Sequence, residues 1–143
     1  MLVDRILDDK GRAVATVAPD ATVADAVAAL AEHNVGALVV SSDGRGVEGI
    51  VSERDIVRGL ADGADVLQRR VSDLMATDVC TCHGRSDIEE LMTTMTTGRF
   101  RHLPVVADDE LCGIISIGDV VKARIDELAT ETQQLVGYIR DGR

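Results

Sequence analysis

The stretch GIVSERDIV at residues 49–57 is followed later in the chain by GIISIGDVV at residues 113–121. Glycine, isoleucine, serine and aspartate keep their places in the two copies, and both copies end in an apolar pair. Such internal similarity indicates a duplicated unit. We therefore predict two equivalent halves, each ending in a strand, a tight turn and a helix.

The similarity continues upstream of these turns. The run GALVV at residues 36–40 corresponds to RHLPV at residues 101–105, and both have the length and composition of buried strands. Before each run, apolar residues recur with helical spacing, at positions 23–30 and 88–95. Two amphipathic helices should therefore occupy equivalent places.

Polar residues indicate where these two helices begin. Thr22-x-x-Asp25 and Ser86-x-x-Glu89 both have the pattern of a capping box. In a capping box, the first side chain accepts from a free amide of the first turn, and the second side chain accepts from the amide of the cap residue. We expect the two helix starts to be equivalent.

Each half also opens with similar elements. A short lead helix is predicted at residues 3–7 and 71–75, followed by a strand near residues 13–17 or 79–81. The order in each half is then β-α-β-β-α, and the fold class is α/β (α+β). Because a unit of about 60 residues buries too little surface alone, the two repeats should pack about a pseudo-twofold axis.

The predicted hairpin turns, at residues 42–46 and 107–110, differ in length, and the second hairpin should be tighter. After Leu128 a polar segment at residues 130–134 interrupts the apolar pattern, which returns at residues 135–139. We expect a further helix there, used in dimer contacts. The predicted domains are residues 1–64 (first repeat), 65–70 (connector), 71–128 (second repeat) and 129–143 (C-terminal helical tail).

Composition limits the possible partners. The formal net charge of −10 and the pI near 4.6 disfavour nucleic-acid and membrane-surface binding. Phe100 and Tyr138 are the whole aromatic content, too little for base-stacking surfaces. No apolar run approaches the roughly 20 residues that a membrane span needs, and three cysteines fit a reducing compartment. We expect a soluble, cytoplasmic protein.

The repeated turn permits two interpretations. Ser52-x-x-Asp55 and Ser116-x-x-Asp119 can be helix caps and nothing more. Alternatively, the free amides and serine of the helix start attract phosphate, and the aspartate accepts hydrogen bonds from ribose hydroxyls. A cap needs no preceding glycine, whereas close approach of a ligand to the backbone favours one. The repeated glycine therefore favours ligand contact.

At this level of detail the sequence resembles a tandem CBS-domain pair, the Bateman module, over roughly residues 3–128. The resemblance rests on both Gly-Ile-x-Ser-x-x-Asp turns, on Pro19-Asp20-x-Thr22-Val23-x-x-Ala26 and on the HLPVV run at residues 102–106. The chain is most similar to small stand-alone bacterial pairs that lack a catalytic barrel.

The resemblance implies binding of adenosine-containing ligands in clefts between the repeats. AMP, ADP or ATP would be the ligand, with NAD and S-adenosylmethionine as alternatives and no catalytic cofactor. It also implies roles for individual residues: ribose contacts from Asp55 and Asp119 with Ser52 and Ser116 beside them, adenine contacts from Val14 and Val79, and phosphate contacts from Arg101 and His102, with Arg54 as a further candidate.

Other reactive residues carry weaker signals. Cys80-x-Cys82-His83 could supply metal ligands, but a structural zinc site needs a fourth. Cys80 and Cys112 fall at predicted strand positions, where cysteine acts as a small apolar residue. We therefore expect no metal site and no catalytic thiol.

Three classes of function remain open. The first is a non-catalytic sensor of adenine nucleotides that acts as a homodimer on an unidentified regulated protein. The second is a dimerisation and docking module that needs no ligand, in which the turns are only caps. The third is an enzyme acting on the bound nucleotide, for which no arrangement of acid and base is recognisable.

Overall fold

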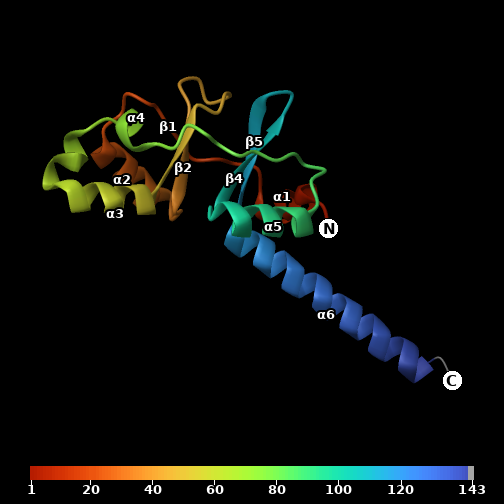
Figure 1. The fold of residues 1–143 in the computed structure, drawn as a ribbon. Coiled ribbons are helices and arrows are strands. Elements are labelled where there is room, and N and C mark those ends of the chain that lie inside the picture. The colour runs from red at the N-terminus through yellow and green to blue at the C-terminus, as the bar shows by residue number, and fades with distance from the viewer. Residues whose placement is uncertain (142–143) are drawn as a thin grey trace.

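The computed structural model describes residues 1–141, which form two lobes side by side and a long C-terminal helix that projects from one of them (Figure 1). Two similar mixed α/β repeats were predicted, and this architecture is confirmed. In chain order the elements are α1 (Val3–Lys10), β1 (Thr16–Val17), α2 (Val23–His33), β2 (Ala37–Val40), β3 (Gly49–Ser52), α3 (Glu53–Asp62), the 3₁₀ helix η1 (Ala64–Gln68), α4 (Val71–Leu74), α5 (Ile88–Gly98), β4 (His102–Ala107), β5 (Glu110–Ser116) and α6 (Ile117–Asp141).

Each lobe is built around a small sheet. In the first, β1 runs parallel to β2, and β2 pairs antiparallel with β3. In the second, β4 and β5 form an antiparallel hairpin. Ala37 lies opposite Ser52 and His102 lies opposite Ser116, so the two repeats bring equivalent positions to the strand-to-helix turn.

The strand predicted near residues 79–81 is absent, and Pro104 explains why. In the first repeat the amide of Val39 donates to the carbonyl of Ala15, which holds β1 against β2. The equivalent of Val39 in the second repeat is Pro104, which has no amide hydrogen to donate. Only the isolated bridge between Cys82 and Val105 remains at this edge.

The hairpin of the second repeat is tight, as predicted. Ala107 pairs with Glu110 across a two-residue turn. Asp108 and Asp109 both have positive φ angles, of 51° and 62°. These angles are those of the type I′ turn, whose twist matches that of the strands it joins, and aspartate tolerates this conformation better than most residues.

The lead helices are exchanged between the repeats. Val3, Ile6 and Leu7 of α1 are buried in the core of the second repeat, with α5, β4, β5 and the start of α6. Conversely, Val66 of η1 and Val71 of α4 are buried in the core of the first repeat. Figure 1 shows α1 in the lobe of β4 and β5, and α4 in the lobe of β1 to β3. Each core thus takes a segment from the other half of the sequence. The predicted domain boundaries at residues 64 and 70 stay a prediction.

The glycine that precedes each turn makes room for the exchanged segment. A Cβ atom on Gly113 would lie 2.9 Å from the Leu7 methyl groups, and one on Gly49 would lie 2.7 Å from the Met75 sulfur. Real Cβ atoms essentially never come so close. Packing inside the protein thus accounts for these glycines, so they no longer favour ligand contact over capping, and ligand contact at the turns stays a prediction.

The caps of the two central helices differ. Thr22 and Asp25 form the predicted capping box at the start of α2. At the start of α5, however, the cap is Asp87, whose side chain accepts from the amide of Glu89. The Ser86 hydroxyl oxygen instead accepts from the amide of His83 in the preceding loop. The predicted capping box at Ser86 is wrong because this local turn uses its side chain.

A single helix replaces the predicted final helix and separate tail helix. Helix α6 runs without a break from Ile117 to Asp141, and residues 142–143 of the predicted tail lie outside the described residues. The polar segment lies inside this helix, where Thr130 and Thr132 donate to the carbonyls four residues before them. No helix within residues 1–141 combines the length and the apolar character that crossing a bilayer requires.

The exchange predicts a coupled effect on stability. Gly113→Ala should lower the free energy of unfolding by about 1–3 kcal/mol through overpacking, and Leu7→Ala by about 2–5 kcal/mol through a cavity. The double variant should lose less than the sum, because the smaller residue 7 leaves space for the new methyl group. Urea unfolding measures all three values. Gly137→Ala, at a position with nothing within 4 Å, is the control and should not destabilise; strict additivity of the other two would contradict the contact.

Candidate functional site

The first repeated turn is a complete capping box. The amide of Asp55 donates to the Ser52 hydroxyl oxygen, and Asp55 Oδ2 accepts from the amide of Ser52 at 2.8 Å. The Ser52 hydroxyl also donates to Asp55 Oδ2 at 3.0 Å. The capping interpretation is confirmed here, yet Asp55 Oδ1 accepts no hydrogen bond from the described residues.

The second turn has the same cap and an additional ion pair. The amide of Asp119 donates to the Ser116 hydroxyl oxygen, and Asp119 Oδ2 accepts from the amide of Ser116 at 2.9 Å. Lys10, at the end of α1, also donates to Asp119 Oδ2 at 2.7 Å and to the carbonyl of Ile114 at 3.0 Å. The exchanged helix therefore places a cation directly on the second turn.

This ion pair favours the ionised form of Asp119. Burial by itself raises the pKa of Asp119, but the Lys10 ammonium and the Ser116 donors outweigh it, so the pKa lies below its ordinary value. Asp119 is thus ionised at neutral pH. Its Oδ1 atom has no hydrogen bond to the described residues and can accept one from a ligand.

His102 lies at the boundary between the two lobes. Its Nε2 atom lies 3.6 Å from where a Cβ atom on Gly36 would stand, close to the Glu53 carboxylate of the other repeat. Burial lowers the pKa of His102, and the carboxylates of Glu53 and Asp119 only partly offset this effect. His102 is therefore neutral at neutral pH, so it can exchange hydrogen bonds with a phosphate but supplies no fixed positive charge.

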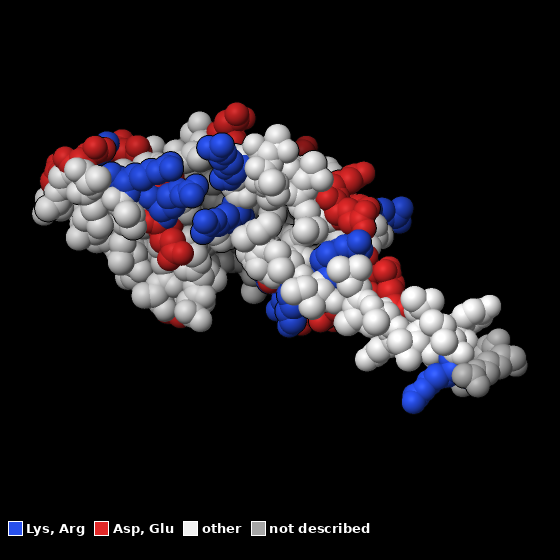
Figure 2. Space-filling model, turned by 60° about the horizontal axis from the view of Figure 1, so that its bottom comes forward, with Lys and Arg blue, Asp and Glu red and all other residues white. Residues whose placement is uncertain are grey.

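Four arginines gather around one cleft between the repeats. Arg54 and Arg58 extend from α3, and Arg99 and Arg101 come from the segment between α5 and β4. The cleft has a volume of about 380 Å³, its remaining lining is Met95, Thr96, Phe100 and Ile117, and no carboxylate lines it. Figure 2 shows basic side chains gathered on this face of an otherwise acidic protein.

Within residues 1–141, none of these four guanidinium groups forms an ion pair. Four like charges facing one space repel one another, and a bound anion would relieve that repulsion. Guanidinium groups also match the geometry of phosphate oxygens. The arrangement is therefore suited to a phosphorylated ligand.

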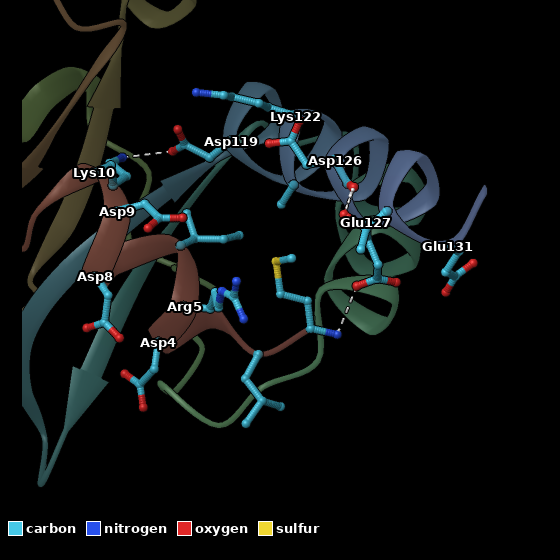
Figure 3. A pocket seen from close by; sticks show the side chains of 15 residues that line it. Asp4, Arg5, Asp8, Asp9, Lys10, Asp119, Lys122, Asp126, Glu127 and Glu131 are labelled. Carbon is cyan, nitrogen blue, oxygen red and sulfur yellow. Dashed lines mark hydrogen bonds and ion pairs between the residues drawn. The ribbon is translucent and has the colours of Figure 1, made fainter. Parts of the chain in front are cut away.

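A second, wider cavity of about 740 Å³ lies between α1 and α6 (Figure 3). It is bordered by seven carboxylates, three basic side chains and the amino group of Met1, so its net negative charge opposes phosphate binding. Two ion pairs cross it: Lys10 with Asp119, and the amino group of Met1 with Glu127 at 3.2 Å. Asp119 of the second turn lines this cavity, but the cavity's negative charge would repel the phosphates of a nucleotide.

The structure brings some of the predicted residues together and leaves others apart. Arg54 and Arg101 share the arginine cleft, whereas Asp119 lines the acidic cavity. Val14 and Val79 are half-buried and line neither cavity.

Three basic residues of the site were not among the predicted contacts: Lys10, Arg58 and Arg99. Arg58 lies one helical turn after Arg54, a spacing that could have identified it. Lys10 gave no comparable signal, because its partner Asp119 lies in the other half of the chain.

The cysteines have structural surroundings of different kinds. Cys82 is buried in the second core, and this burial raises the pKa of its thiol to about 12. Cys112 lies in β5, as predicted, but Cys80 is exposed and outside any strand. Nδ1 of His83 hydrogen-bonds to the carbonyl of Val106. Among the described residues, no three His, Cys, Asp or Glu side chains gather as a set that could hold a metal ion.

Comparison with known proteins gives consistent results. Residues 10–62 and 71–126 each match the CBS domain. The crystal structure of the CBS-domain containing protein ATU1752 from Agrobacterium tumefaciens superposes with a TM-score of 0.83, at 49% identity, over 87% of this chain and 99% of that one. The mitochondrial CBS domain-containing protein CBSX3 of Arabidopsis thaliana is 39% identical over 86% of this chain, which spans 62% of that relative's length.

A more distant structure shares the fold. The CBS domain pair of protein MJ0100, solved in complex with 5′-methylthioadenosine and S-adenosyl-L-methionine, superposes with a TM-score of 0.76 over 86% of this chain and 98% of that one. Its sequence identity is 22%, so the likeness concerns the arrangement of the elements.

The ion pair at the second turn predicts a pH effect. Lys10→Met should raise the pKa of Asp119, because burial is then opposed only by the Ser116 donors. A carboxylate whose pKa is lower in the folded than in the unfolded protein stabilises the fold at pH values above the unfolded pKa, about 3.9 for aspartate. This stabilisation is lost as the pH falls through the pKa of the folded state. Acid destabilisation should therefore begin at higher pH in the variant.

Carbon NMR titration of the Asp119 carboxyl group measures the pKa, and urea unfolding between neutral and acid pH measures the stability. Arg12→Met is the matched control, because Arg12 pairs with Asp4 and Asp8 instead. An Asp119 pKa that is the same in Lys10→Met and in the unmodified protein would show that the ion pair has no influence in solution.

Proposed function

The chain belongs to the CBS-domain family, and from this premise we propose that it is a non-catalytic regulatory module that binds an adenosine-containing nucleotide between its two repeats. The observation that carries the proposal is the cleft of four unpaired arginines, drawn equally from both repeats of a chain with a net charge of −10. Protein MJ0100, which has the same fold, was solved with two adenosine-containing ligands.

The two turn aspartates supply the ribose contacts. In both Asp55 and Asp119, Oδ2 is occupied by the cap while Oδ1 is open to a hydroxyl donor. Capping and ribose binding therefore do not exclude each other. The cap holds the carboxylate in one orientation before the ligand arrives, which reduces the entropy lost on binding.

The charge of the cleft selects among adenosine ligands. AMP, ADP and ATP present increasing negative charge to Arg54, Arg58, Arg99 and Arg101, and NAD presents two phosphates. S-adenosylmethionine carries a positive sulfonium group and would be repelled by the same residues. The preferred ligand is therefore a nucleotide with phosphates, with the adenine near Val14, just before β1, or Val79, in the segment between α4 and α5.

The two turns should bind with different affinity. A ligand at Asp119 meets the Lys10 ammonium on the same carboxylate, whereas Asp55 has no cation bound to it among the described residues. A ribose hydroxyl that binds Asp119 must share the carboxylate with Lys10 or displace Lys10 from it. The Asp55 turn is therefore the site that fills first.

The protein would act as an energy or metabolite sensor in the cytoplasm, where its free cysteines Cys80, Cys82 and Cys112 stay reduced. It would work as a homodimer and pass the signal to a regulated protein. The alternative is a ligand-independent dimerisation and docking module, which the confirmed caps at Ser52 and Ser116 also allow.

The ribose contacts predict a loss of binding. Calorimetry should detect binding of AMP, ADP or ATP to the unmodified protein, and Asp55→Ala combined with Asp119→Ala should abolish it. The melting temperature of the unmodified protein should rise with nucleotide concentration. In the docking alternative the double substitution lowers the melting temperature through lost caps, but no nucleotide shifts it.

The arginine cleft predicts a dependence on phosphate. Arg54→Ala or Arg101→Ala should each weaken ATP binding about tenfold to a hundredfold, because a charge-assisted hydrogen bond contributes about 1.5–3 kcal/mol. Adenosine, which lacks phosphate, should bind the variants and the unmodified protein alike. Arg85→Ala, which removes an exposed arginine outside the cleft, is the matched control. Equal losses for ATP and adenosine would place the phosphates elsewhere.

A further inference from the structure

The projecting helix α6 exposes a group of large apolar side chains. Ile125, Leu135 and Ile139 have exposed fractions of 59%, 60% and 64%, and Val121 and Leu128 are 40% and 45% exposed. An exposed apolar group of this size on one element indicates an interaction surface. The helix extends away from both lobes (Figure 1).

The spacing of these residues is that of a coiled-coil seam. Positions 121, 125, 128, 132, 135 and 139 alternate steps of four and three, the a and d positions of a heptad repeat. At about 100° per residue they lie within roughly 40° on either side of one line along the helix. They are called the seam below.

The seam does not face the protein's own core. The buried residues of α6 are Val120 and Ala123, which pack with α1, α5 and β5 and point about 100° or more away from the seam. The seam is therefore an additional face of the helix, and it continues beyond the part of α6 that the second lobe covers.

The seam residues match those of a parallel pair of identical helices. The a positions are Ile125, Thr132 and Ile139, and the d positions are Val121, Leu128 and Leu135. β-Branched residues at a with leucine at d favour two-stranded parallel coiled coils. In that arrangement each seam residue meets its own copy, so the surface is complementary to itself.

Thr132 is the polar residue of the seam, and it can be buried without cost to hydrogen bonding. Its hydroxyl donates to the carbonyl of Leu128 at 2.9 Å. In a parallel pair Thr132 lies opposite Thr132 of the second copy, whereas a shifted register would place it against isoleucine or leucine. The unshifted register is favoured because it alone keeps all six seam positions in contact with their copies.

Charges beside the seam also favour the parallel direction. In a parallel pair Arg124 lies opposite Ala129 of the second copy, and Glu131 lies opposite Val136. In the antiparallel pair with full overlap, Glu131 would face Glu131 of the second copy, and like charges there are unfavourable.

We infer that the seam of α6, over residues 121–139, pairs in parallel with the same seam of a second copy of this chain. This inference deepens the homodimer proposed above by assigning its interface. The twofold axis then runs along the paired helices, and the two-lobed bodies lie side by side at the same end of the coil.

The test is the mass of the full chain in solution by light scattering. The unmodified protein should have twice the 15.2 kDa of one chain. Leu128→Glu combined with Leu135→Glu should give a single-chain mass at the same concentration, because the seam would then contain opposing carboxylates. Gln133→Glu combined with Gln134→Glu adds the same charge off the seam and should leave the dimer intact.

A second variant avoids new charge. Leu135→Ser combined with Ile139→Ser should also give the mass of one chain, and both seam variants should keep the helical circular dichroism of the folded repeats, since the altered residues are exposed. A single-chain mass for the unmodified protein would overturn both the homodimer and the seam. A dimer mass for the seam variants would overturn the seam alone and leave the homodimer standing.

Cross-linking tests the direction of the pair. With Cys80, Cys82 and Cys112 replaced by alanine, Thr132→Cys should form a disulfide between two chains on mild oxidation, because its copies face each other in the parallel pair. Glu131→Cys should cross-link poorly. Cross-linking through Glu131→Cys in place of Thr132→Cys would overturn the parallel arrangement.

Discussion

The exchange of lead helices is the contact on which the rest of the structure depends. Leu7 packs over Gly113 and Met75 over Gly49, so each repeat is completed by a segment from the other half of the chain. Each core therefore contains segments from both halves of the sequence, and the chain crosses between the lobes twice, after α1 and after α4. Arg54 and Arg101 line the cleft between the lobes from opposite sides.

The same exchange gives a structural reason for the glycine of the repeated turn. Three residue types of the motif have an internal role: the glycine admits the lead segment, and the serine and aspartate cap the helix. The motif by itself is thus no proof of a ligand. Two features exceed these structural needs: Oδ1 of each aspartate accepts no hydrogen bond from residues 1–141, and the four cleft arginines form no ion pair within the same range. The proposal of nucleotide binding rests on these features.

The sequence allowed prediction of those features that depend on local pattern. Helical spacing located α2 and α5, and the turn cluster at Asp108 and Asp109 predicted the tighter hairpin. The missing strand near residue 80 was also predictable, since Pro104 lacks the necessary donor. The exchange of the lead helices was not predictable, because the two helices have similar apolar patterns and either one would fit either core. Lys10 was therefore missed, since its position on Asp119 follows only from the exchange.

Helix α6 connects the two surfaces that the structure exposes. Its first turn contains Asp119, and its far part contains the seam, within one unbroken helix from Ile117 to Asp141. A ligand shifts an equilibrium only through contacts that differ between two states. The pair of Lys10 with Asp119 is a contact that a ligand can change without repacking a core, because it is partly exposed and joins α1 to the start of α6. A nucleotide that competes for Asp119 would therefore act on the same helix that carries the dimer seam.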